Sequence, residues 1–292
     1  MLARIQARRN KHSRPSSPTA PSSDEELEKQ RVRHNPYETA QFVLVPMPLR
    51  RNAWEEGDAR EFDVRSVTYL EDKVKTPSLP SVFQLLTCDL VQVDEPLLTG
   101  LCSHPSERIQ TALREEQETG EQILPAFIYA VNLCVPAGTA TYHWVAYFGI
   151  EDVSVLKDTS TPLGKLTEPF FFGDDDEVRN KAFKLIPRIV EGNVMVRKAV
   201  GSKPAVLGQK LKHYYTRTER FLEMVVDIGS NKVAQRIVRC AIGCAKSLTV
   251  DMMFLLEGDS AETLPEHILG GVRLTNIDFK VKDGQRKVVP TP

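Results

Sequence analysis

Two stretches near the middle of the chain alternate apolar and polar side chains in the way that β-strands do. Every second position of residues 126–135 and of residues 141–150 is apolar, and most are aromatic or β-branched. These positions are Phe127, Tyr129, Val131, Leu133 and Val135, then Tyr142, Trp144, Ala146, Phe148 and Ile150. Residues 136–139, Pro-Ala-Gly-Thr, have turn chemistry. The pattern therefore predicts an antiparallel hairpin with a buried aromatic face.

Residues 230–247 follow the spacing of an amphipathic helix. Apolar residues recur every three or four positions, and basic or amide residues occupy the opposite side. The apolar stripe comprises Val233, Ile237, Val238, Ala241, Ile242 and Ala245, and the polar stripe comprises Lys232, Gln235, Arg236, Arg239 and Lys246. Ser230 stands where its hydroxyl could accept a bond from a first-turn amide and cap the helix. We expect this helix to cover the aromatic face of the hairpin.

Strand patterns flank the helix at residues 221–228 and 248–256. A strand, helix and strand in this order pair in parallel with a right-handed crossover if both strands share a sheet. Further elements are expected as strand or helix at residues 69–70 and 82–93, an exposed helix at 103–120, a helix at 264–269 and a strand at 272–281. The fold class is therefore α+β, with a mixed, largely antiparallel sheet covered by amphipathic helices.

Composition divides the chain into a tail and one domain. Residues 1–23 contain five cations and no acid and end in a Ser/Pro run, which is typical of a disordered basic tail or of an organellar transit peptide. We therefore expect a tail at residues 1–35, a domain at 36–285 and a flexible end at 286–292. The expected location is the cytoplasm or a membrane surface, or the mitochondrion or plastid if residues 1–23 act as a transit peptide.

Charge and cysteine content exclude some classes of protein. The formal net charge is −1, so no global basic field attracts nucleic acid, and we expect no nucleic-acid partner. The five cysteines are an odd number scattered through apolar segments, which indicates reduced thiols rather than a disulfide framework. No run of about 18 apolar residues is present, so any membrane contact is expected to be peripheral.

The run from Gly173 to Leu211 resembles a family signature. It contains Gly-Asp-Asp, Arg-Asn, Phe-Lys-Leu-Ile-Pro, Ile-Val-Glu-Gly and Val-Gly-x-Lys-Pro in that order, and the likeness extends to residues 69–75, 222–256 and 264–274. This order resembles the C-terminal domain of the plant Enhanced Disease Resistance 2 family, over roughly residues 50 to 280. In that family the domain usually follows a pleckstrin-homology domain and a lipid-binding START domain, and members are linked to lipid-dependent restraint of cell death and defence. Only about 50 residues precede the match, so neither companion domain is expected here.

Two motifs within this run invite a ligand. Asp174, Asp175 and Asp176 could gather a hard divalent cation, but carboxylates also favour a helix start, and no second acidic cluster completes a cation shell. We therefore predict a helix start whose apolar stripe continues through Val178, Ala182, Phe183 and Ile186, and no bound metal or cofactor. In Gly201-Ser202-Lys203-Pro204 the first glycine of a phosphate loop is absent, and the proline removes an amide, so a turn with an exposed lysine is expected.

Motifs for catalysis are missing from the sequence. It has no Gly-x-Ser-x-Gly, no Cys-x-x-Cys and no His-Glu-x-x-His, and its histidines are dispersed. His143 alternates with the aromatic residues of its strand and should therefore point to the opposite face. We predict a protein that is not an enzyme, with an uncharacterised hydrolase as an alternative.

A lipid-binding or peripheral-membrane regulatory module is the function that the family resemblance favours. The apolar ligand is expected at Phe183, Ile186, Met195, Met252 and Phe254, of which the methionines adapt to irregular shapes. An anionic headgroup is expected at Arg179, Lys184, Arg188 and Lys203. A well-filled core and a solvated charged face explain the same residues without a ligand. A scaffold domain that binds other proteins and no ligand is the further alternative.

Overall fold

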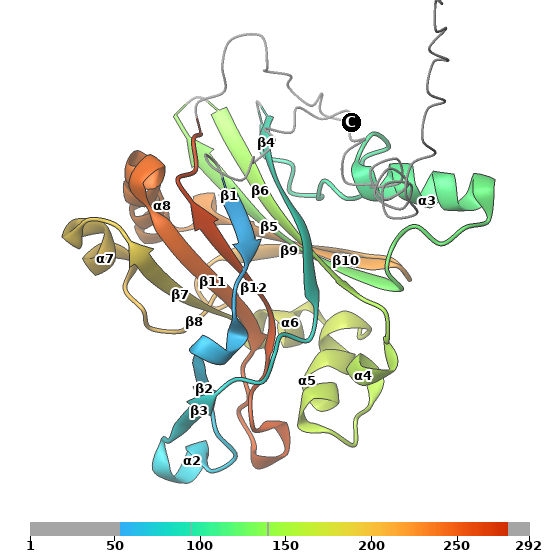
Figure 1. The fold of residues 1–292 in the computed structure, drawn as a ribbon, viewed down its shortest axis with the longest axis horizontal. Helices are drawn as coiled ribbons and strands as arrows, with labels where there is room; N and C mark the ends of the chain where they lie inside the picture. The colour runs from blue at the N-terminus through green and yellow to red at the C-terminus, as the bar shows by residue number, and fades with distance from the viewer. Residues whose placement is uncertain (1–52, 94, 139, 280–292) are drawn as a thin grey trace, which may run out of the picture. The chain divides into compact units, whose positions relative to one another are not determined.

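The computed structural model describes residues 53–93, 95–138 and 140–279 (Figure 1). The predicted tail and flexible end lie outside these residues. The α+β class with largely antiparallel strands is confirmed, but the described strands form two five-stranded sheets and one small two-stranded sheet instead of a single sheet. None of the helices in the described residues has the length and apolar character needed to cross a bilayer.

The first sheet contains the predicted hairpin. Its two strands, β5 (Phe127–Ala137) and β6 (Ala140–Ile150), are antiparallel and place Leu133 opposite Trp144, as the alternating pattern requires. β10 (Phe221–Asp227) pairs in parallel with β5 and antiparallel with β9 (Lys212–Arg217). The strand order is β4 (Gln84–Val93), β6, β5, β10 and β9.

The second sheet is antiparallel throughout. Its order is β1 (Ala53–Glu56), β12 (Ile268–Thr275), β11 (Thr249–Leu256), β7 (Phe183–Glu191) and β8 (Ala205–Val206). The short strands β2 (Asp63–Arg65) and β3 (Lys75–Pro77) pair with each other. The first and the last described strands, β1 and β12, are thus neighbours in this sheet.

The helices surround the two sheets. The predicted exposed helix is α3 (Arg108–Thr119), which ends at Gly120 with a φ of 72°, and the predicted amphipathic helix is α8 (Lys232–Cys244). The other helices are α2 (Tyr69–Asp72), α4 (Ser154–Lys157), α5 (Pro162–Phe171), α6 (Asp176–Ala182) and α7 (Val194–Val200). Short 3₁₀ turns are η1 (Ala59–Glu61), η2 (Ile228–Ser230), η3 (Ala245–Ser247) and η4 (Ala261–Thr263).

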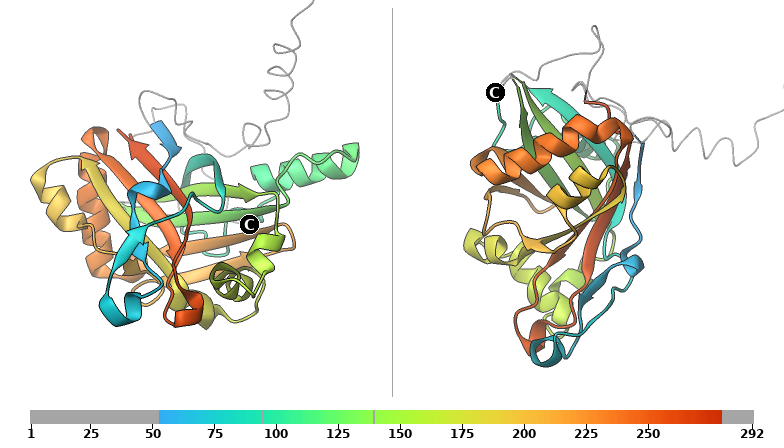
Figure 2. Two further views of the ribbon diagram at one scale, coloured as in Figure 1. Left: turned by 60° about the horizontal axis from the view of Figure 1, so that its bottom comes forward. Right: turned by 90° about the vertical axis from the view of Figure 1, so that its left-hand side faces the viewer.

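Two expectations about elements are wrong, and the condition for the parallel strand pair, a shared sheet, is not met. β10 and β11 do not pair in parallel, because α8 carries the chain from the first sheet to the second (Figure 2, right). The predicted helix at residues 264–269 is the approach to β12, which starts at Ile268. The helix after the acidic run ends at Ala182, and Phe183 begins β7, where Pro187 could not have continued a helix. Pairing with β11 thus overrides the helical spacing.

Between the sheets lies an aromatic core. Phe148 of β6 and Phe254 of β11 are both fully buried, and their ring centroids are 5.9 Å apart. Gly270 of β12 allows this close packing, because a Cβ there would stand 2.6 Å from the Phe148 ring. The layer continues through Phe83, Tyr129, Phe170, Phe171 and Phe183. Aromatic side chains therefore fill the space between the two sheets at this end of the fold.

Candidate functional site

A cavity of about 540 Å³ lies at the other end, beneath α8. The first sheet contributes Leu133 and Trp144, and the second contributes Leu185, Ile189 and Met252. Only three lining residues are polar, namely Lys203, Lys210 and Asn231. Apolar pockets of this size with a few polar groups are typical of small-molecule sites.

The amphipathic helix α8 forms one wall of this cavity. Its apolar stripe, including Ala234, Val238 and Ile242, faces the cavity, as the sequence predicted for a helix covering the hairpin. The predicted cap is wrong: Asn231, not Ser230, accepts the bonds from the first-turn amides. The hydroxyl of Ser230 donates instead to the carbonyl of Asp227, the last residue of β10. Asn231 also donates to the carbonyl of Lys210, which fastens the helix to the neighbouring loop.

Trp144 supplies a buried polar atom to this otherwise apolar wall. The residue is 4% exposed, and its Nε1–H has no hydrogen-bond partner among the described residues. Buried indole N–H groups normally find an acceptor, and leaving one unpaired costs roughly 1–3 kcal/mol. Trp144 lines the cavity, so its wall contains one unpaired donor; the atom itself is covered, and a ligand with an oxygen acceptor would reach it only after a small shift of the side chains around it.

The structure separates the five residues predicted to bind an apolar ligand. Only Met252 lines the cavity. Phe183 and Phe254 stack on each other in the closed core, with ring centroids 5.9 Å apart. Ile186 packs in a small cluster on the opposite face of its sheet, and Met195 is 73% exposed on α7.

Strand alternation explains this separation and shows which residues the sequence analysis missed. Successive residues of a strand point to opposite faces. Leu185 and Ile189 share the inward face of β7 with Phe183, so they reach the cavity while Ile186 faces away. The alternation of apolar residues along β7 contains this signal, but the same residues also fit the spacing of a helix. The apolar stripe of α8, by contrast, was already visible in the sequence.

The four residues predicted to meet an anionic headgroup are also dispersed. Arg179 is buried and donates to the carbonyl oxygens of Phe170 and Gly173. Lys184 is buried against Glu266 in an ion pair. Arg188 belongs to the ion-pair network described below, and Lys203 alone is exposed beside the cavity.

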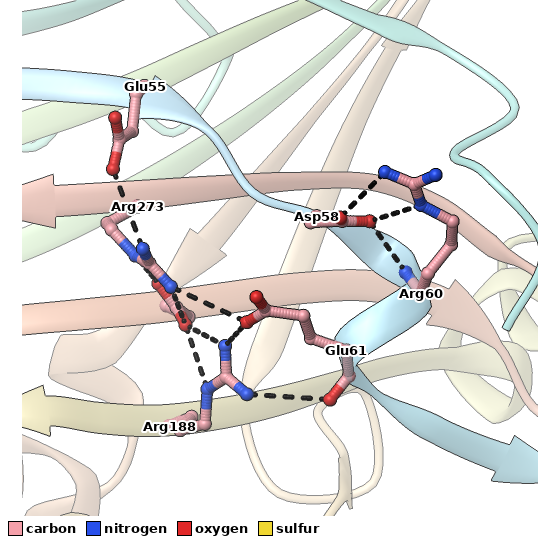
Figure 3. A network of polar contacts seen from close by, with 7 residues as sticks. Glu55, Asp58, Arg60, Glu61, Arg188 and Arg273 are labelled. Atoms are coloured by element: carbon pink, nitrogen blue, oxygen red, sulfur yellow. Dashed lines mark hydrogen bonds and ion pairs between the residues drawn. The ribbon is translucent and has the colours of Figure 1, made fainter. Parts of the chain in front are cut away.

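A network of charges stands on the outer face of the second sheet (Figure 3). Asp251 of β11 is fully buried and accepts bonds from Arg188 at 2.7 Å and from Arg273 at 2.6 Å. Glu61 of η1 also pairs with both arginines. The hydrogen bonds that Arg273 donates to Asp251 raise the pKa of Arg273 above its ordinary value. The network therefore ties β7, β11, β12 and η1 together electrostatically.

The acidic run at residues 174–176 starts a helix, as predicted. Asp175 accepts a bond from the amide of Glu177 and caps α6. Asp176 pairs with Arg179, and Asp174 pairs with Arg217. At the other motif, Gly201 ends α7 with a φ of 69°, and Lys203 is exposed after it. The predicted turn with an exposed lysine is confirmed.

A second group of buried polar residues lies on the opposite face of the first sheet. Glu223 accepts bonds from the amides of Leu101 and Cys102 and from Asn132. His143 accepts from the amide of Leu97 at Nε2, so its Nδ1 carries the proton that it donates to Asn132. His143 thus points away from the aromatic core, as predicted. These contacts fasten a loop to the sheet and leave the carboxylate and imidazole fully buried.

This arrangement predicts a pH-dependent stability. Burial lowers the pKa of His143 from 6.5 to about 4. As the pH falls from 6.5 to 4, the unfolded chain binds a proton at this residue and the folded chain does not, so stability present above pH 6.5 is lost. His143→Gln, which keeps a donor and an acceptor, should lose less stability by about 2 kcal/mol between pH 7 and pH 4.5. Urea unfolding at pH 7 and at pH 4.5 measures the difference, and parallel losses in the two proteins would contradict it.

Comparisons with known proteins agree with the sequence resemblance. Residues 54–278 match the model of the family described as Protein ENHANCED DISEASE RESISTANCE 2, C-terminal. The chain is 36% identical over 229 residues to the Protein ENHANCED DISEASE RESISTANCE 2-like of Arabidopsis thaliana. This match covers 78% of the chain and 29% of that relative, so the chain spans less than a third of the relative's length. No solved structure matches. The chain therefore belongs to the family of the ENHANCED DISEASE RESISTANCE 2 C-terminal domain.

Proposed function

We propose that this domain is a non-enzymatic module that binds a lipid or a similar amphiphile in the cavity beneath α8. The observation that carries the proposal is the cavity itself, whose 540 Å³ is enclosed by apolar side chains from both sheets and from one helix. An apolar ligand gains about 0.8 kcal/mol for each methylene group that it buries. The absence of water-binding groups from most of the wall favours an acyl chain or a ring system over a polar metabolite.

The polar atoms of the cavity indicate where the polar part of the ligand would lie. Trp144 offers its unpaired Nε1–H within the wall. Lys203 and Lys210 are exposed and also line the cavity, so they mark its solvent-facing side. A ligand with an oxygen acceptor on a long apolar body satisfies both features. We propose that the module has a regulatory role, which it exerts at a membrane surface or on a protein partner.

Bromine quenching of Trp144 provides a direct test. Trp54, the other tryptophan, lies on β1 and does not line the cavity. In a Trp54→Phe protein, titration with monomeric 9,10-dibromostearic acid should quench the remaining fluorescence with saturation, because bromine must approach Trp144. Unbrominated stearic acid is the control and should compete with the quencher. Native mass spectrometry of the purified protein should also detect a copurified lipid. Quenching that does not saturate, together with an empty protein, would refute the proposal.

Trp144→Phe tests the role of the single buried donor. The change keeps an aromatic six-membered ring and removes the five-membered ring that bears the Nε1–H, so it should weaken binding of oleic acid by about two- to tenfold, the value of one hydrogen bond. Binding of 1-octadecene, which has no acceptor, should be unchanged. Competition measured by native mass spectrometry compares the two ligands. Equal losses for both would show that Trp144 contributes by its shape alone.

A further inference from the structure

The outer side of the cavity is covered by a surface with a strong excess of cations. This surface comprises α7, the segment of residues 201–212, which includes β8, and α8, and we name it the α7–α8 cap (Figure 1). α7 packs on the end of α8, where Asn193 donates to the Sγ of Cys244. The sequence has no aspartate or glutamate at residues 192–217 or at residues 228–250, although the whole chain has a net charge of −1. The cap is therefore positively charged within a protein that is not.

The cations of the cap are directed to solvent. On α8 they form the stripe opposite the cavity: Lys232, Arg236, Arg239 and, just beyond the helix, Lys246. The remaining exposed cations of the cap are Arg197, Lys198, Lys203, Lys210 and Lys212. Among the described residues, only Lys246 of this set has an ion-pair partner, Asp278. Elsewhere in the fold, arginines such as Arg188 and Arg273 are paired with carboxylates.

Three large apolar side chains project from the same cap. Val194 and Met195 begin α7 and are 66% and 73% exposed, and Val233 in the first turn of α8 is 64% exposed. Isolated exposed apolar residues are common, but here they stand at both ends of a basic helix face. Basic faces with exposed apolar residues are typical of surfaces that bind anionic bilayers.

We propose that the α7–α8 cap docks on an anionic bilayer, with its cations on the headgroups and Val194, Met195 and Val233 inserted among them. Charge complementarity selects this partner, and the apolar residues favour a bilayer over a nucleic acid or an acidic protein. The proposal rests on the proposed lipid binding for its purpose: docking brings the cavity of α8 next to the source of its ligand. Docking itself requires no ligand in the cavity.

Sedimentation with vesicles tests this docking. The full chain should bind vesicles of phosphatidylcholine containing phosphatidylserine at least about tenfold more tightly than vesicles of phosphatidylcholine alone. The double variant Arg236→Glu with Arg239→Glu should remove this difference, because its affinity for the vesicles that contain phosphatidylserine should fall at least about tenfold. Lys75→Glu with Lys181→Glu changes the net charge equally at two exposed cations outside the cap and should have little effect. Equal binding to both vesicles, or equal losses in both variants, would overturn the proposal.

A second pair of double variants tests the insertion of apolar side chains into the bilayer. Val194→Ser with Met195→Ser should weaken binding to the anionic vesicles several-fold, because each side chain loses its apolar contact with the bilayer. Val67→Ser with Leu79→Ser changes side chains that are 63% and 65% exposed outside the cap, and should not. If only the charge reversal weakens binding and competing nucleic acid removes the protein from vesicles, the bilayer is not the partner.

The docking surface and the cavity can fail independently. Arg236→Glu with Arg239→Glu should still be quenched by dibromostearic acid added in solution, because these side chains face away from the cavity. A cavity filled by a larger side chain should lose this quenching and keep its binding to anionic vesicles. Loss of vesicle binding in the filled protein would contradict docking by the cap, whereas absence of quenching in every protein would contradict only the proposed ligand.

Discussion

Val238→Trp is expected to abolish ligand binding while leaving the fold intact. Val238 lies on the inner stripe of α8 and lines the cavity, so the indole has empty space to enter. The added ring occupies volume that an acyl chain would use, and filling a void does not carry the cost of overpacking a closed core. Occupancy by dibromostearic acid should fall at least about tenfold, and the free energy of unfolding should change by less than about 1.5 kcal/mol.

Val238→Ile is the matched control for this variant. It adds one methylene group at the same position and should retain most of the binding. Competitive displacement of a labelled fatty acid measures both proteins, which avoids the second tryptophan fluorescence that the variant introduces. Unchanged binding in Val238→Trp would mean that the ligand, if any, lies elsewhere, and the proposed function would lose its main support.

Asp251→Asn is expected to destabilise the domain by about 3 kcal/mol. The carboxylate is fully buried and neutralises Arg188 and Arg273, which it contacts at 2.7 and 2.6 Å. The amide has similar shape but no charge, so two guanidinium groups would face each other with only the more exposed Glu61 and Glu55 as remaining partners. Removing one partner of a buried ion pair costs more than the pair contributes, because the other charges stay desolvated.

Replacing Asp251 together with both of its arginine partners gives the control. In Asp251→Leu with Arg188→Met and Arg273→Met, no buried charge is left, and most of the lost stability should return. Urea unfolding at pH 7 measures the free energy of unfolding for each protein. Ligand quenching should be unaffected in both, because the network lies on the face of the second sheet that points away from the cavity. A single variant as stable as the wild type would show that the network contributes little.

The cavity wall was only partly predictable from sequence. α8 could be predicted because its apolar and basic residues alternate with a helical period that does not depend on distant partners. β7 could not, because Phe183 and Ile186 fit a helix that starts at Asp175 as well as they fit a strand. Pairing with β11 decided between the two, and it placed Leu185 and Ile189 on the cavity wall.

The roles of the charged residues also could not be predicted from the sequence alone. Arg179, Lys184 and Arg188 lie close together in the sequence and look like a basic patch. Each instead has its own partner in the fold. Arg179 donates to a carbonyl near the end of α5, Lys184 pairs with Glu266, and Arg188 pairs with Asp251. The spacing of residue types along the sequence does not reveal such partners. Only the three-dimensional contacts distinguish a buried, paired cation from one that is available to a ligand.

By itself, the sequence determined the family, the α+β class, the β5–β6 hairpin and the amphipathic helix, because each depends on local spacing or on a long ordered motif. Tertiary structure alone decided that the strands divide into two sheets and that α8 runs between them over a cavity. It also decided which cations are paired and that those of the α7–α8 cap face solvent. The physical reason is that burial and pairing depend on residues far apart in the chain, whereas periodicity depends on neighbours.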